Sequence, residues 1–230
     1  MQQGFKTKQN RDYYNIAHGN ICKNVPEGTE GASRVEVKNK TTGEIKVYHE
    51  ISHTSVCAIL ENVTFKDDKF GKTWSLYLSV NGKQIVVQMK ETSRICADFL
   101  KKLPNLKQGE QYTFTPYDFI NEKEKRSVGF SIKNLKGEKI SSFYHSYDEK
   151  TKTTIPINGF PLFPEDAESF TPEDWKMFFG YTIMAKFLRP KSLEFVSKNF
   201  KNDFVSKPPV DDVDHDSTLP DFDESEDVPF

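Results

Sequence analysis

The last twenty residues of the chain carry the most distinctive chemistry in the sequence. The segment from Asp211 to Phe230 holds nine acidic residues and no lysine or arginine. Its like charges repel and it has little apolar area to bury, so we expect it to be disordered. It closes on Asp227-Val228-Pro229-Phe230, which places an aromatic ring beside a free terminal carboxylate. Such a peptide is suited to docking in an apolar pocket with a basic rim.

An acidic C-terminus that closes on Asp-(Ile/Leu/Val)-Pro-Phe resembles the single-stranded DNA-binding proteins of bacteria and their phages. The resemblance covers about twenty residues of 230, so it bears on function more directly than on fold. It implies that the tip, Asp227, Val228, Pro229 and Phe230, recruits replication or repair proteins, and that the tail competes with DNA for the binding groove. An acidic tail that serves solubility alone is the alternative interpretation.

The net charge of −2 conceals a separation along the chain. The nine acids of the tail follow Pro208, and the residues from Met1 to Lys207 keep 32 basic against 25 acidic side chains, a charge of about +7. A basic body with a tethered polyanion is expected when the body binds nucleic acid and the tail mimics it. The charge is moderate, and proteins without a nucleic acid ligand also reach it.

Cysteine usage and apolar segments bear on the cellular compartment. Three scattered cysteines, Cys22, Cys57 and Cys96, argue against a disulfide framework and for a reducing environment. The first residues lack the apolar stretch of a signal peptide, and no segment approaches the ~18 apolar residues of a membrane helix. We therefore expect a cytoplasmic protein with no membrane partner, in the host cytoplasm if a phage encodes it. The oligomeric state stays open, and the sequence is compatible with a homo-oligomer.

Most of the chain alternates between apolar and polar residues with a period of two, which predicts strands. Residues 1–31 lack clear periodicity and are expected to form an N-terminal arm. The predicted strands cover about 34–40, 44–51, 55–65, 74–80, 83–90, 111–119, 127–133 and 139–144. Between the fifth and sixth strands the period changes and predicts a helix over 92–103, with Thr92 or Ser93 as its cap.

The order strand, strand, strand, helix, strand, strand between Ser55 and Lys133 is that of an OB-fold, a five-stranded barrel that commonly binds oligonucleotides. We therefore predict a mainly β fold: an OB-fold barrel with an added N-terminal hairpin, accessory C-terminal helices and the acidic tail. The accessory helices are expected from Thr171 to about Leu188, ending before Pro190, and near 193–200. The parts are then the arm 1–31, the OB-fold domain 32–207 and the tail 208–230.

Cations along the phosphates and aromatic rings under the bases hold single strands of nucleic acid. Strand parity turns Trp74, Leu76 and Leu78 inward and leaves Tyr77 on the outer face of its hairpin, among hydroxyl and amide side chains. This makes Tyr77 the leading candidate for base stacking. The candidate nucleic-acid-binding residues are Tyr77, Lys90, Lys72, Tyr48, Lys46, Arg34, Lys38, Tyr112, Lys125 and Arg126.

Two alternatives stay open among these candidates. Tyr112 and Phe114 share one face of their strand, and Tyr117 and Phe119 occupy the opposite face, so one pair belongs to the core. Parity alone does not say which pair that is. The candidates between 34 and 51 also fit a solvated strand face.

The remaining motifs of the sequence bear on metal binding and catalysis. The spacings His18-x₃-Cys22 and His53-x₃-Cys57 could together form a tetrahedral zinc site. Four steps along an extended strand separate two side chains by about 13 Å, too far for one metal, so we predict no metal site. The chain has no phosphate loop, nucleophile elbow or HExxH motif, so we predict no enzymatic activity and no cofactor.

These observations predict a single-stranded DNA-binding protein, of phage type by its size and long insertions. It would coat exposed strands in DNA replication, recombination and repair, with affinity from phosphates and stacking. The alternative is a replisome adaptor whose body binds protein and whose tail mimics nucleic acid. Salt-dependent binding of an unstructured oligonucleotide separates the two.

Overall fold

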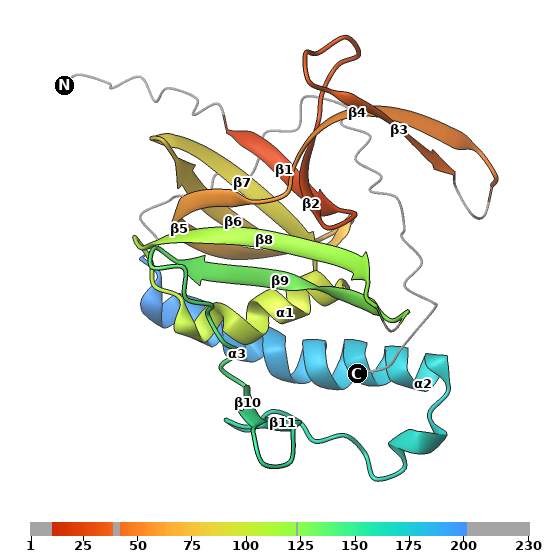
Figure 1. Ribbon diagram of the computed structural model, residues 1–230, viewed down its shortest axis with the longest axis vertical. Coiled ribbons are helices and arrows are strands. Elements are labelled where there is room, and N and C mark those ends of the chain that lie inside the picture. The colour runs from red at the N-terminus through yellow and green to blue at the C-terminus, as the bar shows by residue number, and fades with distance from the viewer. Residues whose placement is uncertain (1–10, 39–41, 123, 202–230) are drawn as a thin grey trace.

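The computed structural model describes residues 11–38, 42–122 and 124–201, and a nine-stranded sheet curled into half a barrel dominates it (Figure 1). Of these residues, 45% lie in strands and 23% in helices, so the predicted mainly β class is confirmed. The strands of the sheet are β1 Asp12–Ala17, β2 Asn20–Asn24, β3 Ser33–Lys38, β4 Ile45–His53, β5 Val56–Asp68, β6 Gly71–Val80, β7 Lys83–Lys90, β8 Gln111–Ile120 and β9 Arg126–Asn134. Their order across the sheet is β3-β4-β2-β1-β7-β6-β5-β8-β9.

The remaining elements follow β7 or β9 in the chain. They are α1 Arg94–Lys102, a 3₁₀ turn Leu103–Asn105, the strand pair β10 His145–Asp148 and β11 Thr153–Pro156, a 3₁₀ turn Ala167–Ser169, α2 Pro172–Met177, a π-helical stretch Phe178–Leu188 and α3 Arg189–Asn199. In Figure 1 the helices lie together on one side of β8 and β9. Among the described residues, no helix is both long and apolar enough to cross a membrane.

Strands β5, β6 and β7 form an antiparallel meander at the centre of the sheet, as the alternation predicted. Asn81 and Gly82 join β6 to β7 with φ angles of 50° and 79°, the left-handed geometry of a type I′ turn. Trp74, Leu76 and Leu78 have no exposed surface. The predicted inward parity of β6 is therefore confirmed, and this face of the sheet meets the helices.

The N-terminal segment belongs to the sheet, which corrects the prediction of an arm. β1 pairs in parallel with β7 and antiparallel with β2. The turn between β1 and β2 consists of His18 and Gly19 with φ angles of 50° and 69°. Asparagine or aspartate more often precedes the glycine of such turns, so the sequence signal was weak. A Cβ on Gly19 would lie 2.5 Å from the backbone nitrogen of Asp118, so this turn rests against β8 and helps to close the curl.

Helix α1 has the expected cap and protects an edge of the sheet. The Ser93 hydroxyl accepts a backbone N–H of the first turn at 3.1 Å. The Asp98 carboxylate accepts the N–H of Phe130 at 2.7 Å, and the Lys102 ammonium donates to the carbonyl of Phe130 at 2.8 Å. These two bonds satisfy the backbone groups of Phe130 at the free edge of β9, where a further strand could otherwise pair.

The chain after β9 departs most from the prediction. The strand expected over 139–144 is absent, and an isolated bridge joins Lys139 to Lys133 instead. The capping box at Thr171 is present, but the helix that it starts continues past Pro190 to the end of α3. The N–H of Arg189 bonds to a carbonyl five residues earlier. This wider turn has room for the ring of Pro190, whereas a regular α-helical turn does not.

An ion pair fastens the long C-terminal helix to the sheet. Arg189, at the start of α3, donates to both carboxylate oxygens of Glu91 at 2.6 and 2.5 Å. Glu91 follows β7 directly and is 4% exposed. The Arg189 guanidinium also lies 5.5 Å from the ring centroid of Phe65 in β5. The helix is thereby held against the inner face of the central meander.

Candidate nucleic-acid interface

A row of side chains that includes two tyrosines crosses four strands on the outer face of the sheet. The strand register aligns Tyr13 of β1, Val86 of β7, Tyr77 of β6 and Asn62 of β5. Directly paired residues point to the same face, so the two rings flank Val86 on the side away from the core. Tyr13 is 50% exposed and Tyr77 is half-buried, whereas Val86 is fully buried. Two strand spacings, or about 10 Å, separate the two tyrosines.

Small polar side chains surround this row on the same face. The neighbouring lines of the register hold Asn15, Thr64, Ser75, Ser79, Gln84 and Gln88. The Gln84 amide donates to Glu61, which lies at the bulge of β5. Hydroxyl and amide groups both donate and accept hydrogen bonds, so this surface suits a sugar–phosphate chain of any sequence.

Some of the nearby basic side chains lie on the same face as this aromatic row, and others do not. The guanidinium of Arg11 lies over the Tyr77 ring, 5.3 Å from its centroid, as a cation–π pair. Lys90 shares the outer face of Tyr77 at the end of β7. Lys72 follows the inward parity of β6, and its ammonium lies 3.9 Å from the carboxylate of Asp67. The structure thus brings Arg11 and Lys90, but not Lys72, to the face of the aromatic row.

Tyr13 is not among the predicted candidates, because residues 1–31 lack clear periodicity and predict an arm. The Asp12 carboxylate fixes β1 through ion pairs to Lys23 of β2 at 2.7 Å and Lys83 of β7 at 2.5 Å. Hydrogen bonds from these two ammonium groups, Lys23 first, lower the pKa of Asp12. The local signal was the apolar alternation of Tyr14 and Ile16, too short to predict a strand by itself.

The predicted cations of the β3–β4 hairpin divide between its two faces. Pairing through β2 puts Lys46 and Tyr48 on the same face as Tyr13, and both are half-buried. Arg34 and Lys38 point to the opposite face, because their partners in β4 have the other parity. Arg34 also forms an ion pair within its own strand at 2.5 Å. Lys46 and Tyr48 therefore lie on the face of the aromatic row, and Arg34 and Lys38 do not.

Tyr112 belongs to the core, so its assignment to the nucleic-acid-binding set is wrong. It is 2% exposed, and its ring lies 6.0 Å from that of Phe114. Its hydroxyl donates to Glu110 at 2.9 Å and accepts the N–H of Lys107 at 3.0 Å. Burial raises the pKa of Tyr112. On β8, Tyr112 and Phe114 point toward the core enclosed by the curled sheet.

The other aromatic pair of β8 lies on the outer face. Phe119 is 54% exposed, and Tyr117 is half-buried across from Gly129 of β9. A Cβ on Gly129 would collide with the Tyr117 hydroxyl, so the glycine leaves room for the ring. The open question of which pair is core is thereby settled in favour of the pair at 112 and 114.

The turn between β8 and β9 presents one of its two predicted cations. Lys125 is exposed. Arg126 donates from Nε and Nη2 to both oxygens of Asp118, at 2.8 and 2.7 Å. The hydrogen bond from Arg126 is the main cause of a lowered pKa of Asp118. A guanidinium engaged with both oxygens of a carboxylate has little capacity left for phosphate.

The predicted partner-binding tip, Asp227 to Phe230, lies outside the described residues. The last described residue, Lys201, donates its backbone N–H to the side-chain oxygen of Gln108 at 2.8 Å. Its carbonyl accepts the Gln108 amide at 3.4 Å. The last described residue therefore lies beside the loop that joins α1 to β8.

The histidines and cysteines of the two His-x₃-Cys spacings do not converge on one point. Among the described residues, no group of three or more His, Cys, Asp or Glu side chains could hold a metal. His18 lies in the β1–β2 turn, and burial raises the pKa of the Cys22 thiol to about 12. His53 faces Tyr14, at 6.1 Å between ring centroids, whereas Cys57 is exposed on the outer face of β5.

No protein-family model, curated protein or solved structure matches this chain.

Proposed function

We propose that this protein binds single-stranded DNA on the outer face of strands β1, β7 and β6. The observation that carries the proposal is the pair of tyrosines, Tyr13 and Tyr77, in one line of the register. Bases stack on such rings without regard to sequence, and each stacked base contributes about 1–3 kcal/mol. Arg11, Lys90 and Lys46 would bind phosphates along the same face.

We also propose that the body is an OB-fold opened by an added strand. Support comes from the strand order β7-β6-β5-β8-β9, in which the first strand of the meander pairs with the strand that follows the helix. In a closed barrel of this type, β7 would meet β9. Here β1 pairs with β7 instead, and the β1–β2 turn rests on β8. The inserted strand thereby adds Tyr13 to the binding face.

The separation of charge supports a second part of the proposal. The acidic tail competes with phosphate for the cations of the body, and its tip recruits replication or repair proteins. The phage origin and the role in replication, recombination and repair are proposed from the resemblance of the tail. Removing residues 208–230 should tighten oligonucleotide binding, most at low salt, where charges are least screened.

The direct test is the binding of a fluorescent oligo-dT, followed by anisotropy over a series of salt concentrations. We expect affinity that falls as salt rises, with a slope of roughly −0.7 per phosphate neutralised, and weaker binding to duplex DNA. Tyr13→Ala should weaken binding. The control is Tyr147→Ala on β10, which should leave binding unchanged. The two tyrosines are comparably exposed, since Tyr147 is 62% exposed and Tyr13 is 50% exposed. Absence of binding at low salt would favour the adaptor function.

A further inference from the structure

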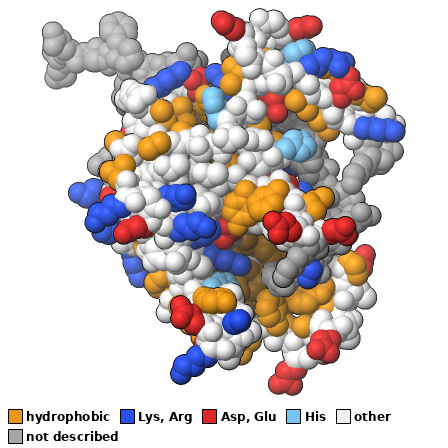
Figure 2. Space-filling view, in the orientation of Figure 1, with side chains coloured by type: hydrophobic (Ala, Val, Ile, Leu, Met, Phe, Trp, Pro, Cys, Tyr) orange, Lys and Arg blue, Asp and Glu red, His pale blue; other side chains and the backbone are white. Residues whose placement is uncertain are grey.

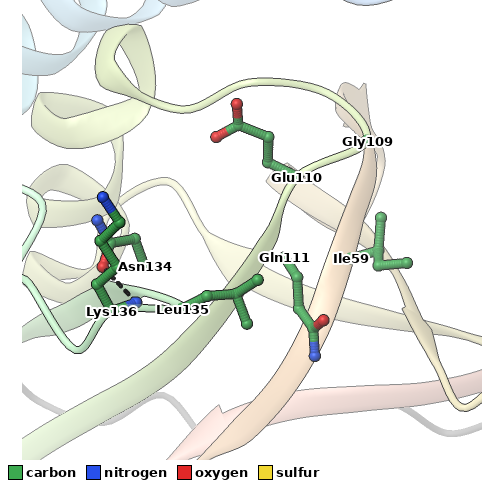
Figure 3. A pocket seen from close by; sticks show the side chains of 7 residues that line it. All are labelled: Ile59, Gly109, Glu110, Gln111, Asn134, Leu135 and Lys136. Atoms are coloured by element: carbon green, nitrogen blue, oxygen red, sulfur yellow. Dashed lines mark hydrogen bonds between the residues drawn. The ribbon is translucent and has the colours of Figure 1, made fainter.

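An open hollow of about 440 Å³ lies where β5 meets β8 and where β9 ends (Figure 3). Its lining consists of Ile59, Gly109, Glu110, Gln111, Asn134, Leu135 and Lys136. The volume is within the range of sites that hold small ligands, roughly 300–1,000 Å³. None of these residues belonged to the predicted site.

The walls of the hollow are apolar and exposed, and its floor is polar. Ile59 is 40% exposed and Leu135 is 72% exposed. Figure 3 shows the side chain of Gln111 between them. The Gln111 amide contacts the sulfur of Cys57 at 3.1 Å. Two apolar walls beside an amide match a flat ring with hydrogen-bonding edges, such as a nucleobase.

The turn that carries Leu135 is held in place by its own hydrogen bonds. The side-chain oxygen of Asn134 accepts the backbone N–H groups of Lys136 at 2.9 Å and Glu138 at 3.0 Å. Gly137 supplies the positive φ of 80° that the turn requires. A ligand therefore meets a wall that is ordered beforehand, which lowers the entropic cost of binding.

Three lysines surround this turn. Lys133, Lys136 and Lys139 are exposed, and none of the three pairs with a carboxylate among the residues that the structure describes. Figure 2 shows lysine and arginine side chains gathered on the side of the molecule where β9 ends. Cations without carboxylate partners are free to bind phosphates.

The hollow lies on the same face as the aromatic row. Ile59 pairs with Ser79 of β6 on one side and with Gln111 of β8 on the other. Ser79 is two residues from Tyr77 on its strand and shares its face. Two strand spacings and two residues along the strand place Gln111 about 12 Å from Tyr77.

We infer that the bound single strand continues from Tyr77 across β5 and inserts a nucleobase into this hollow, between Ile59 and Leu135. The lysines of the β9 turn bind the adjoining phosphates. This inference rests on the proposed function and extends its site by a base-binding position.

The acidic tail is the competing occupant, because Lys201 is bonded to Gln108 beside the hollow. The carboxylate of Glu110 lines the hollow. A neutral base tolerates this neighbour, whereas a peptide rich in carboxylates is repelled by it. The observations therefore favour a base.

The test uses the full chain and the variant Leu135→Asn, with Leu162→Asn as the matched control. The two leucines are 72% and 73% exposed, so neither substitution should change the melting temperature. We expect Leu135→Asn to weaken oligo-dT binding about tenfold, and Leu162→Asn to leave it unchanged. The salt slope of Leu135→Asn should equal that of the wild type, since an apolar contact releases no counterions.

Three results would overturn the inference, and Tyr77→Ala in the same series separates them. If Tyr77→Ala weakens binding but Leu135→Asn behaves as its control, the hollow takes no base and the proposed function stands. If Leu135→Asn tightens binding, the hollow holds the tail. If the wild type does not bind oligo-dT, the proposed function and the inference both fail.

Discussion

Tyr77 lies on β6 and Tyr112 on β8 of the same sheet, yet their surroundings are opposite. Tyr112 is 2% exposed, and its hydroxyl makes two hydrogen bonds inside the protein. Tyr77 is half-buried, and its ring lies beneath the guanidinium of Arg11. A buried tyrosine needs partners for its hydroxyl, whereas a tyrosine on a binding face offers its ring. The comparison separates a core side, where substitutions should change stability, from an outer side, where they should change affinity.

The largest effect is expected on the core side. Trp74→Ala should lower the free energy of unfolding by about 3–5 kcal/mol, because it leaves a cavity in a fully buried site. Chemical denaturation followed by circular dichroism measures this loss. A Trp74→Ala protein of normal stability that no longer bound DNA would break the comparison, because the core side would then carry the binding function.

The next effect belongs to the outer side. Tyr77→Ala should weaken oligo-dT binding by about 1–3 kcal/mol through the loss of a stacked base, with little change in stability. Tyr77→Phe is the matched control, because stacking uses the ring and not the hydroxyl. Anisotropy titrations of both variants would contradict the assignment if Phe and Ala weakened binding equally.

The phenylalanine substitution at Tyr112 sharpens the contrast between the two tyrosines. Tyr112→Phe keeps the ring but removes the hydroxyl that accepts the Lys107 N–H and donates to Glu110. We expect a loss of about 1–2 kcal/mol in the free energy of unfolding, and unchanged DNA affinity. Unchanged stability would show that water replaces the hydroxyl and that the site is less enclosed than its burial indicates.

The smallest effect is a pH dependence of stability, which comes from His145 of β10 beside the core residue Phe160. Burial, and secondly the charge of Lys101, lower the pKa of His145 from 6.5 to about 4. In the unfolded chain His145 is therefore protonated below about pH 6.5, whereas in the folded chain it stays neutral down to about pH 4. The free energy of unfolding should therefore decrease as the pH is lowered through this range. At pH 5 the decrease is on the order of 1 kcal/mol after discounting for solvent screening.

The variant His145→Phe removes the titrating group and keeps a ring beside Phe160, 4.4 Å away between centroids. Thermal melts at pH 7 and pH 5 should show a smaller difference for this variant than for the wild type. An equal difference would assign the pH dependence to other groups. Oligo-dT affinity should be the same for both proteins at pH 7.

Local features of the fold could be predicted from the sequence because short-range physics decides them. Asn81-Gly82 specified a type I′ turn, and the alternation around Trp74 specified which face of β6 is buried. Ser93 and Thr171 were recognisable as helix caps because their hydroxyls bond to the turn that follows directly. Tyr77 reached the outer face by the same local parity.

The tertiary structure alone decided which distant segments share a face. β1 pairs with β7 some seventy residues later in the chain, and this register places Tyr13 in line with Tyr77. The packing of β8 buried Tyr112, and the turn after β9 brought Leu135 to the hollow beside Ile59. The pairing of distant strands depends on loop closure and on the packing of the whole core, to which each segment contributes little by itself. No local pattern of residues encodes that choice.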